Sequence, residues 1–152
     1  MVRGMKIITC PEPIEVNQRS VFLAGGIVGC RDWQADVCAA LQGETGVLLN
    51  PRRPQFPIDD PNAAPEQIEW EFNALRAASA ISFWFAPETV QPIVMFEYGY
   101  WLSQNKPLIV GCSEQYPRRL DVEHQTRLLR PDIEIIYSLN ELIHRIGDYL
   151  AR

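Results

Sequence analysis

The sequence predicts an α/β protein of the flavodoxin-like or Rossmann-like class, a three-layer sandwich with a five-stranded, mostly parallel sheet in the order 2-1-3-4-5. Strand-like and helix-like segments alternate along the chain, which favours a parallel sheet covered on both faces. Several strand-like runs are almost entirely apolar, as expected for buried strands. A length of 152 residues without repeats or low-complexity segments leads us to expect a single domain over residues 1–152.

The first half of the chain contains three strand-like runs and two helical patterns. Lys6–Cys10 is followed by prolines, which suits an edge strand, and Ser20–Ala24 is a buried strand that ends at two glycines. Asp32–Gln42 is predicted to be a helix because its apolar residues share one face. After the strand Gly46–Asn50, a proline-rich loop leads to the helix Pro65–Ala78, whose proline suits a first turn.

The second half continues the same alternation. Three apolar runs are separated by helical patterns, and Ser138 is suited to cap the last helix. The predicted strands are Ala80–Phe85, Pro107–Gly111 and Ile133–Tyr137, and the predicted helices are Ile93–Gln104, Tyr116–Leu129 and Leu139–Leu150.

The predicted strand order places a ligand crevice at one edge of the sheet. In open parallel sheets, ligands bind beyond the carboxyl ends of the strands where the strand order reverses. That point lies between the strands Ser20–Ala24 and Ala80–Phe85. We therefore expect the segments Ala24–Arg31 and Ala86–Glu97 to form the walls of the crevice.

Two glutamates lie within apolar helical stripes. Glu71 falls on the stripe of the helix Pro65–Ala78, and Glu97 falls on that of the helix Ile93–Gln104. A carboxylate on a core-facing stripe is costly unless it is paired, protonated or facing a cavity. Structural pairing with an arginine or a backbone group is the alternative to catalysis for both residues. The two stripes consist of Ile68, Phe72, Leu75 and Ala78, and of Ile93, Phe96, Tyr100 and Trp101.

The environments of the two glutamates predict different roles. Glu97 is close to the start of its helix, where the positive end of the dipole favours an ionised carboxylate suited to be a nucleophile. The apolar flank of Glu71 should raise its pKa and make it a proton donor. A pair of carboxyl groups in opposed environments is typical of glycosidic bond cleavage.

Five segments together resemble the nucleoside 2-deoxyribosyltransferase family, and in particular its 2-deoxyribosyltransferase-like branch. The resemblance covers roughly residues 21–111 and depends on the order and spacing of the segments. They are Phe22-Leu23-Ala24-Gly25-Gly26, Asn50-Pro51-Arg52-Arg53, Gln67-Ile68-Glu69-Trp70-Glu71, the strand Ile81–Phe85 with Pro87, and the run from Glu97-Tyr98-Gly99 to Pro107.

This resemblance implies a flavodoxin-like fold and a covalent mechanism. The family nucleophile is the glutamate of an E-x-G motif, which corresponds to Glu97. The acid that helps the base to leave corresponds to Glu71. Gly25, Gly26 and Ile27 correspond to a turn that lies against the sugar and base. Active sites in the family also take residues from a neighbouring subunit, so the resemblance implies a homo-oligomer.

The chain departs from the family pattern at two positions. Phe22 stands where many transferases have a tyrosine that steadies the nucleophile, and Gln91 stands where many have an aspartate that holds the sugar 5′-hydroxyl. A non-acidic residue at Gln91 suits a phosphorylated or unusual substrate, and we expect it to contact the ligand. Arg52 is a candidate for holding a phosphate and Trp70 for stacking on a base, although a solvated loop charge and core packing are the alternatives.

Composition restricts the possible functions further. A net charge of −5 without a basic run argues against nucleic-acid binding, and no apolar stretch is long enough to suggest a membrane span. The four cysteines show no metal-binding spacing, so we expect free thiols, no metal or cofactor, and a cytoplasmic location. We expect N-glycosyl transfer or hydrolysis on a small nucleoside or nucleotide. The alternatives are a non-catalytic sensor of a nucleotide or ADP-ribose-like ligand and, more weakly, a small flavin protein.

Overall fold

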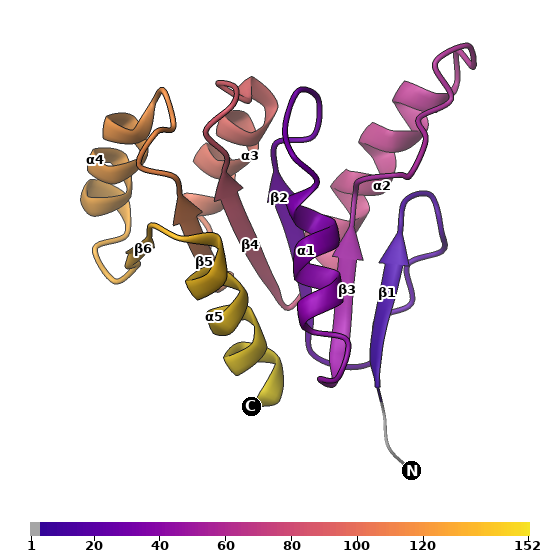
Figure 1. The fold of residues 1–152 in the computed structure, drawn as a ribbon, viewed down its shortest axis with the longest axis horizontal. Helices are drawn as coiled ribbons and strands as arrows, with labels where there is room; N and C mark the ends of the chain where they lie inside the picture. Colours follow the sequence, from indigo (N-terminus) through magenta and orange to yellow (C-terminus); the bar gives the residue numbers. More distant parts are fainter. Residues whose placement is uncertain (1–3) are drawn as a thin grey trace.

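The computed structural model describes residues 4–152 and contains a six-stranded sheet in which every pairing is parallel (Figure 1). The strands are β1 (Met5–Thr9), β2 (Ser20–Gly25), β3 (Gly46–Asn50), β4 (Ala80–Phe85), β5 (Leu108–Cys112) and β6 (Ile135–Ile136). Their order is β1-β3-β2-β4-β5-β6. The predicted order 2-1-3-4-5 is therefore present as β3-β2-β4-β5-β6. The sheet has six strands because the predicted edge strand, β1, pairs with β3.

Five helices cover the two faces of the sheet (Figure 1). Two of them, α1 (Trp33–Ala40) and α5 (Leu139–Ala151), lie on one face, and the other three lie on the opposite face. These are α2 (Ala63–Ala77), α3 (Pro92–Leu102) and α4 (Arg119–Leu129). Each face has its own apolar core, one built on Trp33 and Leu142 and the other on Phe83 and Tyr98. The three-layer architecture that the alternating sequence predicts is confirmed.

Strands β2 and β4 form the centre of the sheet and are buried along their whole lengths. Their parallel register pairs Val21 with Ala80 and Gly25 with Trp84, so both strands reach the same edge together. The chain reverses its order across the sheet between these two strands. The loops that follow them therefore lie side by side, as the sequence predicts.

Several element boundaries differ from the predictions for local reasons. Strand β6 has two residues in place of five. Helix α4 begins at Arg119 and not at Tyr116, because the residues before it form turns in which the amides of Tyr116 and Arg119 bind carbonyls three residues back. The Tyr116 side chain is buried in the core, and its hydroxyl donates a hydrogen bond to the carbonyl of Val90. The predicted cap of α5 is confirmed, since Ser138 Oγ accepts a hydrogen bond from the Glu141 amide at 3.2 Å.

The orientation predicted for the apolar stripes of α2 and α3 was wrong. Ile68 and Phe96 are 67% and 78% exposed, and α2 instead buries a different face containing Trp70 and Ala74. Periodicity identifies an apolar stripe but does not say whether the sheet or the solvent lies beside it. Of the two predicted stripes, Leu75, Ala78 and Trp101 are buried. The exposed remainder forms what we call the α2–α3 apolar surface, which consists of Ile68, Phe72, Ile93, Phe96 and Tyr100.

Among residues 4–152, no helix is both long enough and apolar enough to cross a membrane.

Candidate active site

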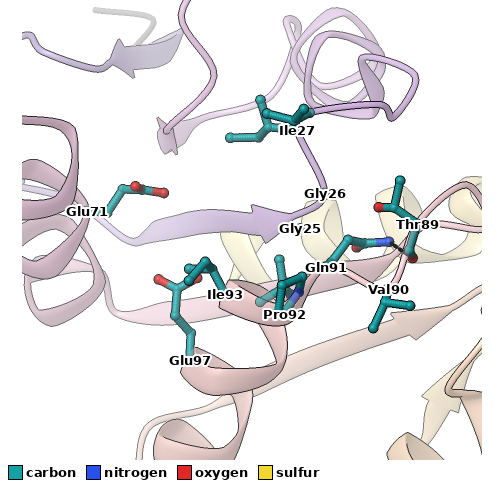
Figure 2. Close-up of a pocket in the computed structure, with 12 residues that line it drawn as sticks. Gly25, Gly26, Ile27, Glu71, Thr89, Val90, Gln91, Pro92, Ile93 and Glu97 are labelled. Carbon is teal, nitrogen blue, oxygen red and sulfur yellow. Dashed lines mark hydrogen bonds between the residues drawn. The ribbon is translucent and has the colours of Figure 1, made fainter. Parts of the chain in front are cut away.

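Glu71 and Glu97 line one hollow at the carboxyl ends of β2 and β4. Its volume is about 390 Å³. Figure 2 shows Glu71 from α2 and Glu97 from α3 extending into the same space, with the glycine turn beyond them. The lining contains six residues that the sequence predicts for this site: Gly25, Gly26, Ile27, Glu71, Gln91 and Glu97. The crevice is therefore where the strand order places it.

A second hollow, of about 410 Å³, opens between α2 and α3. Glu71, Ile93 and Glu97 line both hollows, so the carboxylates lie at their junction. Most of the remaining lining of the second hollow is the α2–α3 apolar surface. The pair is thus bordered by the glycine turn on one side and by an exposed apolar wall on the other.

Both carboxyl groups lie in partly buried positions that favour their protonated forms. Burial raises the pKa of Glu71 to about 7, and hydrogen bonding by Gln67 partly opposes this. Burial, with a smaller contribution from repulsion by Glu71, raises the pKa of Glu97 to about 8. No described lysine, arginine or histidine lines the hollow at the strand ends. Both carboxyl groups therefore keep their protons to a higher pH than an exposed glutamate does.

The expectation that the helix start keeps Glu97 ionised is not met. Helix α3 begins at Pro92, so Glu97 lies in its second turn. The stabilisation by the helix dipole is largely confined to the first turn. Burial consequently dominates and raises the pKa of Glu97, which favours its protonated form.

Gln91 forms part of the wall, but its amide is directed into the loop that follows β4. It is the N-cap residue of α3, with a left-handed φ of 56°. Its Nε2 donates hydrogen bonds to the carbonyls of Ala86 and Thr89, both at 2.8 Å. Figure 2 shows the bond to Thr89. Both amide protons are therefore used within the protein. Gln91 therefore lines the predicted site, and its side-chain amide stabilises the loop after β4.

The glycine turn after β2 is closely packed against this loop. A Cβ atom on Gly26 would lie 2.4 Å from Cys30 Sγ and 2.8 Å from Gln91 Cδ. The Gly26 carbonyl accepts a hydrogen bond from Trp33 Nε1 at 3.1 Å. Glycine is needed here because the neighbouring side chains leave no room for a larger residue.

Replacing Gly26 by alanine is expected to lower the free energy of unfolding by about 1–3 kcal/mol, because an added methyl group overpacks the turn. Denaturant unfolding followed by circular dichroism measures the change. Gly99→Ala is the matched control: a Cβ there has no neighbour within 4 Å, and alanine should stabilise α3 by about 0.5–1 kcal/mol. Equal stability of the two variants would contradict the packing argument.

Arg52 and Trp70, the other predicted ligand contacts, do not line the hollow. The Arg52 guanidinium donates to the carbonyls of Cys30 at 2.7 Å and Arg31 at 3.0 Å, which braces the loop after β2. The Trp70 indole donates to the Glu12 carbonyl at 2.8 Å, and its ring packs beside Phe22. Core packing, the alternative given for Trp70, describes its place better. Arg52 fits neither expectation, because its side chain is only 18% exposed and binds carbonyls of the loop after β2.

Some lining residues were not singled out from the sequence. Val28, Thr89 and Val90 complete the hollow at the strand ends. The two wall segments were predicted, but nothing in their composition distinguishes these positions. Among residues 4–152, no group of three or more histidine, cysteine or acidic side chains is arranged to hold a metal ion.

Comparison with models of protein families identifies the family of this chain. A family model described as "nucleoside 2-deoxyribosyltransferase like" matches residues 18–116, more than half of the sequence. The chain belongs to this family. The match includes the glycine turn, both carboxylates and Gln91, and it agrees with the extent of the resemblance seen in the sequence. It ends at Tyr116, before the last two helices. A search of curated proteins gave no match.

Proposed function

We propose that this protein is an N-glycosyl transferase or N-glycoside hydrolase acting on nucleosides or nucleotides, with Glu97 as nucleophile and Glu71 as acid. The observation that carries the proposal is the meeting of two partly buried carboxyl groups in one hollow at the switch point of the sheet. Membership of a nucleoside 2-deoxyribosyltransferase-like family supports the same chemistry.

The reaction would proceed in two balanced steps. The Glu97 carboxylate attacks C1′ of the sugar through an oxocarbenium-like transition state, the C1′–N bond breaks, and its electrons pass to the base, which takes the proton of Glu71. In the second step a new base or water attacks C1′, the ester to Glu97 breaks, and Glu71 accepts the proton of the attacking group. Attack by a base in the second step gives transfer, and attack by water gives hydrolysis.

The reactive state requires an ionised Glu97 and a protonated Glu71. Burial raises the pKa of both carboxyl groups, which favours a protonated Glu71 and opposes ionisation of Glu97. Ionising Glu97 in the site therefore costs free energy. Ligand contacts along Gly25, Gly26 and Ile27, against the wall held by Gln91, would supply that free energy.

Trapping of the intermediate tests the proposal. The protein is incubated with a 2-fluoro-2-deoxyribosyl nucleoside, which slows hydrolysis of the ester, and the intact mass is measured. We expect a gain equal to one fluorinated sugar, located on Glu97 by peptide mapping. A panel of nucleosides and 5′-monophosphates, scored for released base, would then identify the substrate. Absence of both an adduct and a released base would contradict the proposal.

A non-catalytic sensor of a nucleotide or ADP-ribose-like ligand is the second candidate. Two observations favour it. Phe22 is buried in the core and has no hydroxyl group that could bind the nucleophile. The amide protons of Gln91 already form hydrogen bonds with loop carbonyls. Such a module would bind its ligand reversibly and leave the N-glycosidic bond intact. The trapping experiment separates the two candidates.

We also propose that the protein works as a homo-oligomer in which a second copy covers the α2–α3 apolar surface. Five large side chains are exposed together there, and such patches on soluble chains commonly mark interfaces. Because the second hollow opens in this surface, its coverage would exclude water from the carboxylates. We further propose that residues 1–152 act as one domain in the cytoplasm, where the four free thiols suit a reducing environment.

Phe96→Asp is expected to convert the oligomer to monomers, because it places a charge in the centre of the proposed interface. Light scattering coupled to size-exclusion chromatography measures the mass. Leu128→Asp on α4 is the matched control, since Leu128 is also 78% exposed but lies outside this surface. A monomeric wild-type protein, or equal behaviour of the two variants, would contradict the interface.

A further inference from the structure

One wall of the hollow at the strand ends is joined by a hydrogen bond to a distant part of the chain. Val90 lines this hollow and belongs to the loop between β4 and α3 (Figure 2). Its carbonyl accepts a hydrogen bond from the hydroxyl of Tyr116, which lies 26 residues later, in the turns before α4. The segment that follows β5 therefore contacts the candidate site through this one side chain.

Tyr116 is itself held in place by the end of the sheet. Its side chain is buried, and its ring lies against Phe85 with 5.1 Å between the ring centroids. Its amide donates to the Ser113 carbonyl at 3.0 Å, and the Ser113 amide donates to the Phe85 carbonyl at 3.0 Å. Burial raises the pKa of Tyr116 to about 12, so the hydroxyl keeps its proton at neutral pH and can donate it to a carbonyl. The hydroxyl is thus placed by the last residue of β4.

The hydrogen bonds made by Gln91 do not include Val90. The Gln91 amide binds the carbonyls of Ala86 and Thr89, which are the first and fourth residues of the loop after β4. Within residues 4–152, the hydroxyl of Tyr116 is the one group that donates a hydrogen bond to the Val90 carbonyl. Gln91 therefore stabilises the beginning and middle of the loop, and Tyr116 stabilises the part that follows.

We propose that Tyr116 is a positioning residue which, through its hydrogen bond to Val90, holds the wall after β4 where that wall meets the ligand. Loss of the hydroxyl leaves a carbonyl without its partner and frees this part of the wall, while Glu71 and Glu97 keep their places on α2 and α3. We therefore expect weaker binding with unchanged chemistry. The effect on ligand binding rests on the proposed function, whereas the effect on the loop concerns the ligand-free protein alone.

Backbone relaxation tests the proposal without any ligand. Amide order parameters are measured by ¹⁵N NMR in the wild type and in Tyr116→Phe, which removes the hydroxyl group alone. For Glu88, Thr89 and Val90 we expect values of about 0.85 in the wild type, as in rigid backbone. In Tyr116→Phe we expect them to fall toward about 0.6, the range of flexible segments, while the strands keep their wild-type values.

Tyr98→Phe is the matched control. Tyr98 and Tyr116 are each 3% exposed, and both rings lie 5.1 Å from that of Phe85. The hydroxyl of Tyr98, however, is hydrogen-bonded to Thr126 Oγ1 on α4 at 2.6 Å, and Tyr98 lines neither hollow. Each variant loses one buried hydrogen bond, so a general loss of stability affects both. Unchanged order parameters in the loop of Tyr116→Phe, or an equal fall in Tyr98→Phe, would overturn the proposal.

Adduct formation with the 2-fluoro-2-deoxyribosyl nucleoside separates binding from chemistry. Its rate is followed by intact mass at a series of nucleoside concentrations, which gives a half-saturating concentration and a limiting rate. In Tyr116→Phe we expect the half-saturating concentration to rise about 2–10-fold, as for the loss of one hydrogen bond, and the limiting rate to change by less than about twofold. Tyr98→Phe should change neither quantity by more than this.

The outcomes distinguish a failure of this proposal from a failure of the proposed function. A lower limiting rate in Tyr116→Phe at an unchanged half-saturating concentration would contradict a role in holding the wall. If the wild type forms no adduct and releases no base, the proposed function fails. The order parameters then still decide whether Tyr116 positions the wall, because they are measured on the ligand-free protein.

Discussion

Glu97→Gln is expected to abolish cleavage of the N-glycosidic bond, with a loss of about 10⁴–10⁶-fold, the scale measured when a covalent nucleophile is removed. Glutamine keeps the size of the side chain but cannot form the ester to C1′. The release of free base, followed by chromatography under single-turnover conditions, measures the loss. The same variant should show no adduct with the fluorinated nucleoside.

Two controls separate loss of chemistry from loss of structure. Glu69→Gln removes an exposed acid two residues from Glu71 and should leave the rate unchanged. Glu97→Gln should also be more stable than the wild type at pH 9. The folded-state pKa of Glu97, about 8, lies above the ordinary value of 4.5, so its ionisation opposes folding increasingly between these pH values and fully above pH 8. Full activity in Glu97→Gln would exclude this residue as the nucleophile.

Glu71→Gln is expected to slow the reaction by about 10²–10⁴-fold, because the departing base loses its proton donor. The loss should depend on the base: large for a natural purine or pyrimidine, and small for a nucleoside whose base leaves without protonation. Comparing kcat/KM for the two kinds of substrate in the wild type and the variant measures this dependence. Equal losses for both would show that Glu71 acts in some way other than as an acid.

The sequence predicts the fold well because the fold depends on patterns that are local. Apolar runs such as Ala80–Phe85 identify buried strands. Their alternation with helices predicts the strand order, and the strand order predicts the position of the crevice. The meeting of Glu71 and Glu97 follows from that order. The predictions fail where they depend on what lies beside a helix. Ile68 on α2 and Phe96 on α3 belong to apolar stripes, yet both side chains are exposed to solvent.

The protonation of Glu71 and Glu97 could not be predicted from the sequence for a related reason. Glu97 was expected to benefit from a helix start, but five residues of α3 precede it. Local patterns indicate which side chains reach a pocket. The burial of those side chains, which depends on how distant segments pack, sets the pKa that they have there.

The wall formed by the loop before α3 also bears on affinity. The left-handed backbone of Gln91, its two amide hydrogen bonds and the hydroxyl of Tyr116 on Val90 fix this loop in the ligand-free chain. A mobile loop would have to lose conformational entropy each time a ligand arrived, which weakens binding. Here that ordering is completed during folding, so the pocket is preorganised and association should be fast and require little rearrangement of this segment.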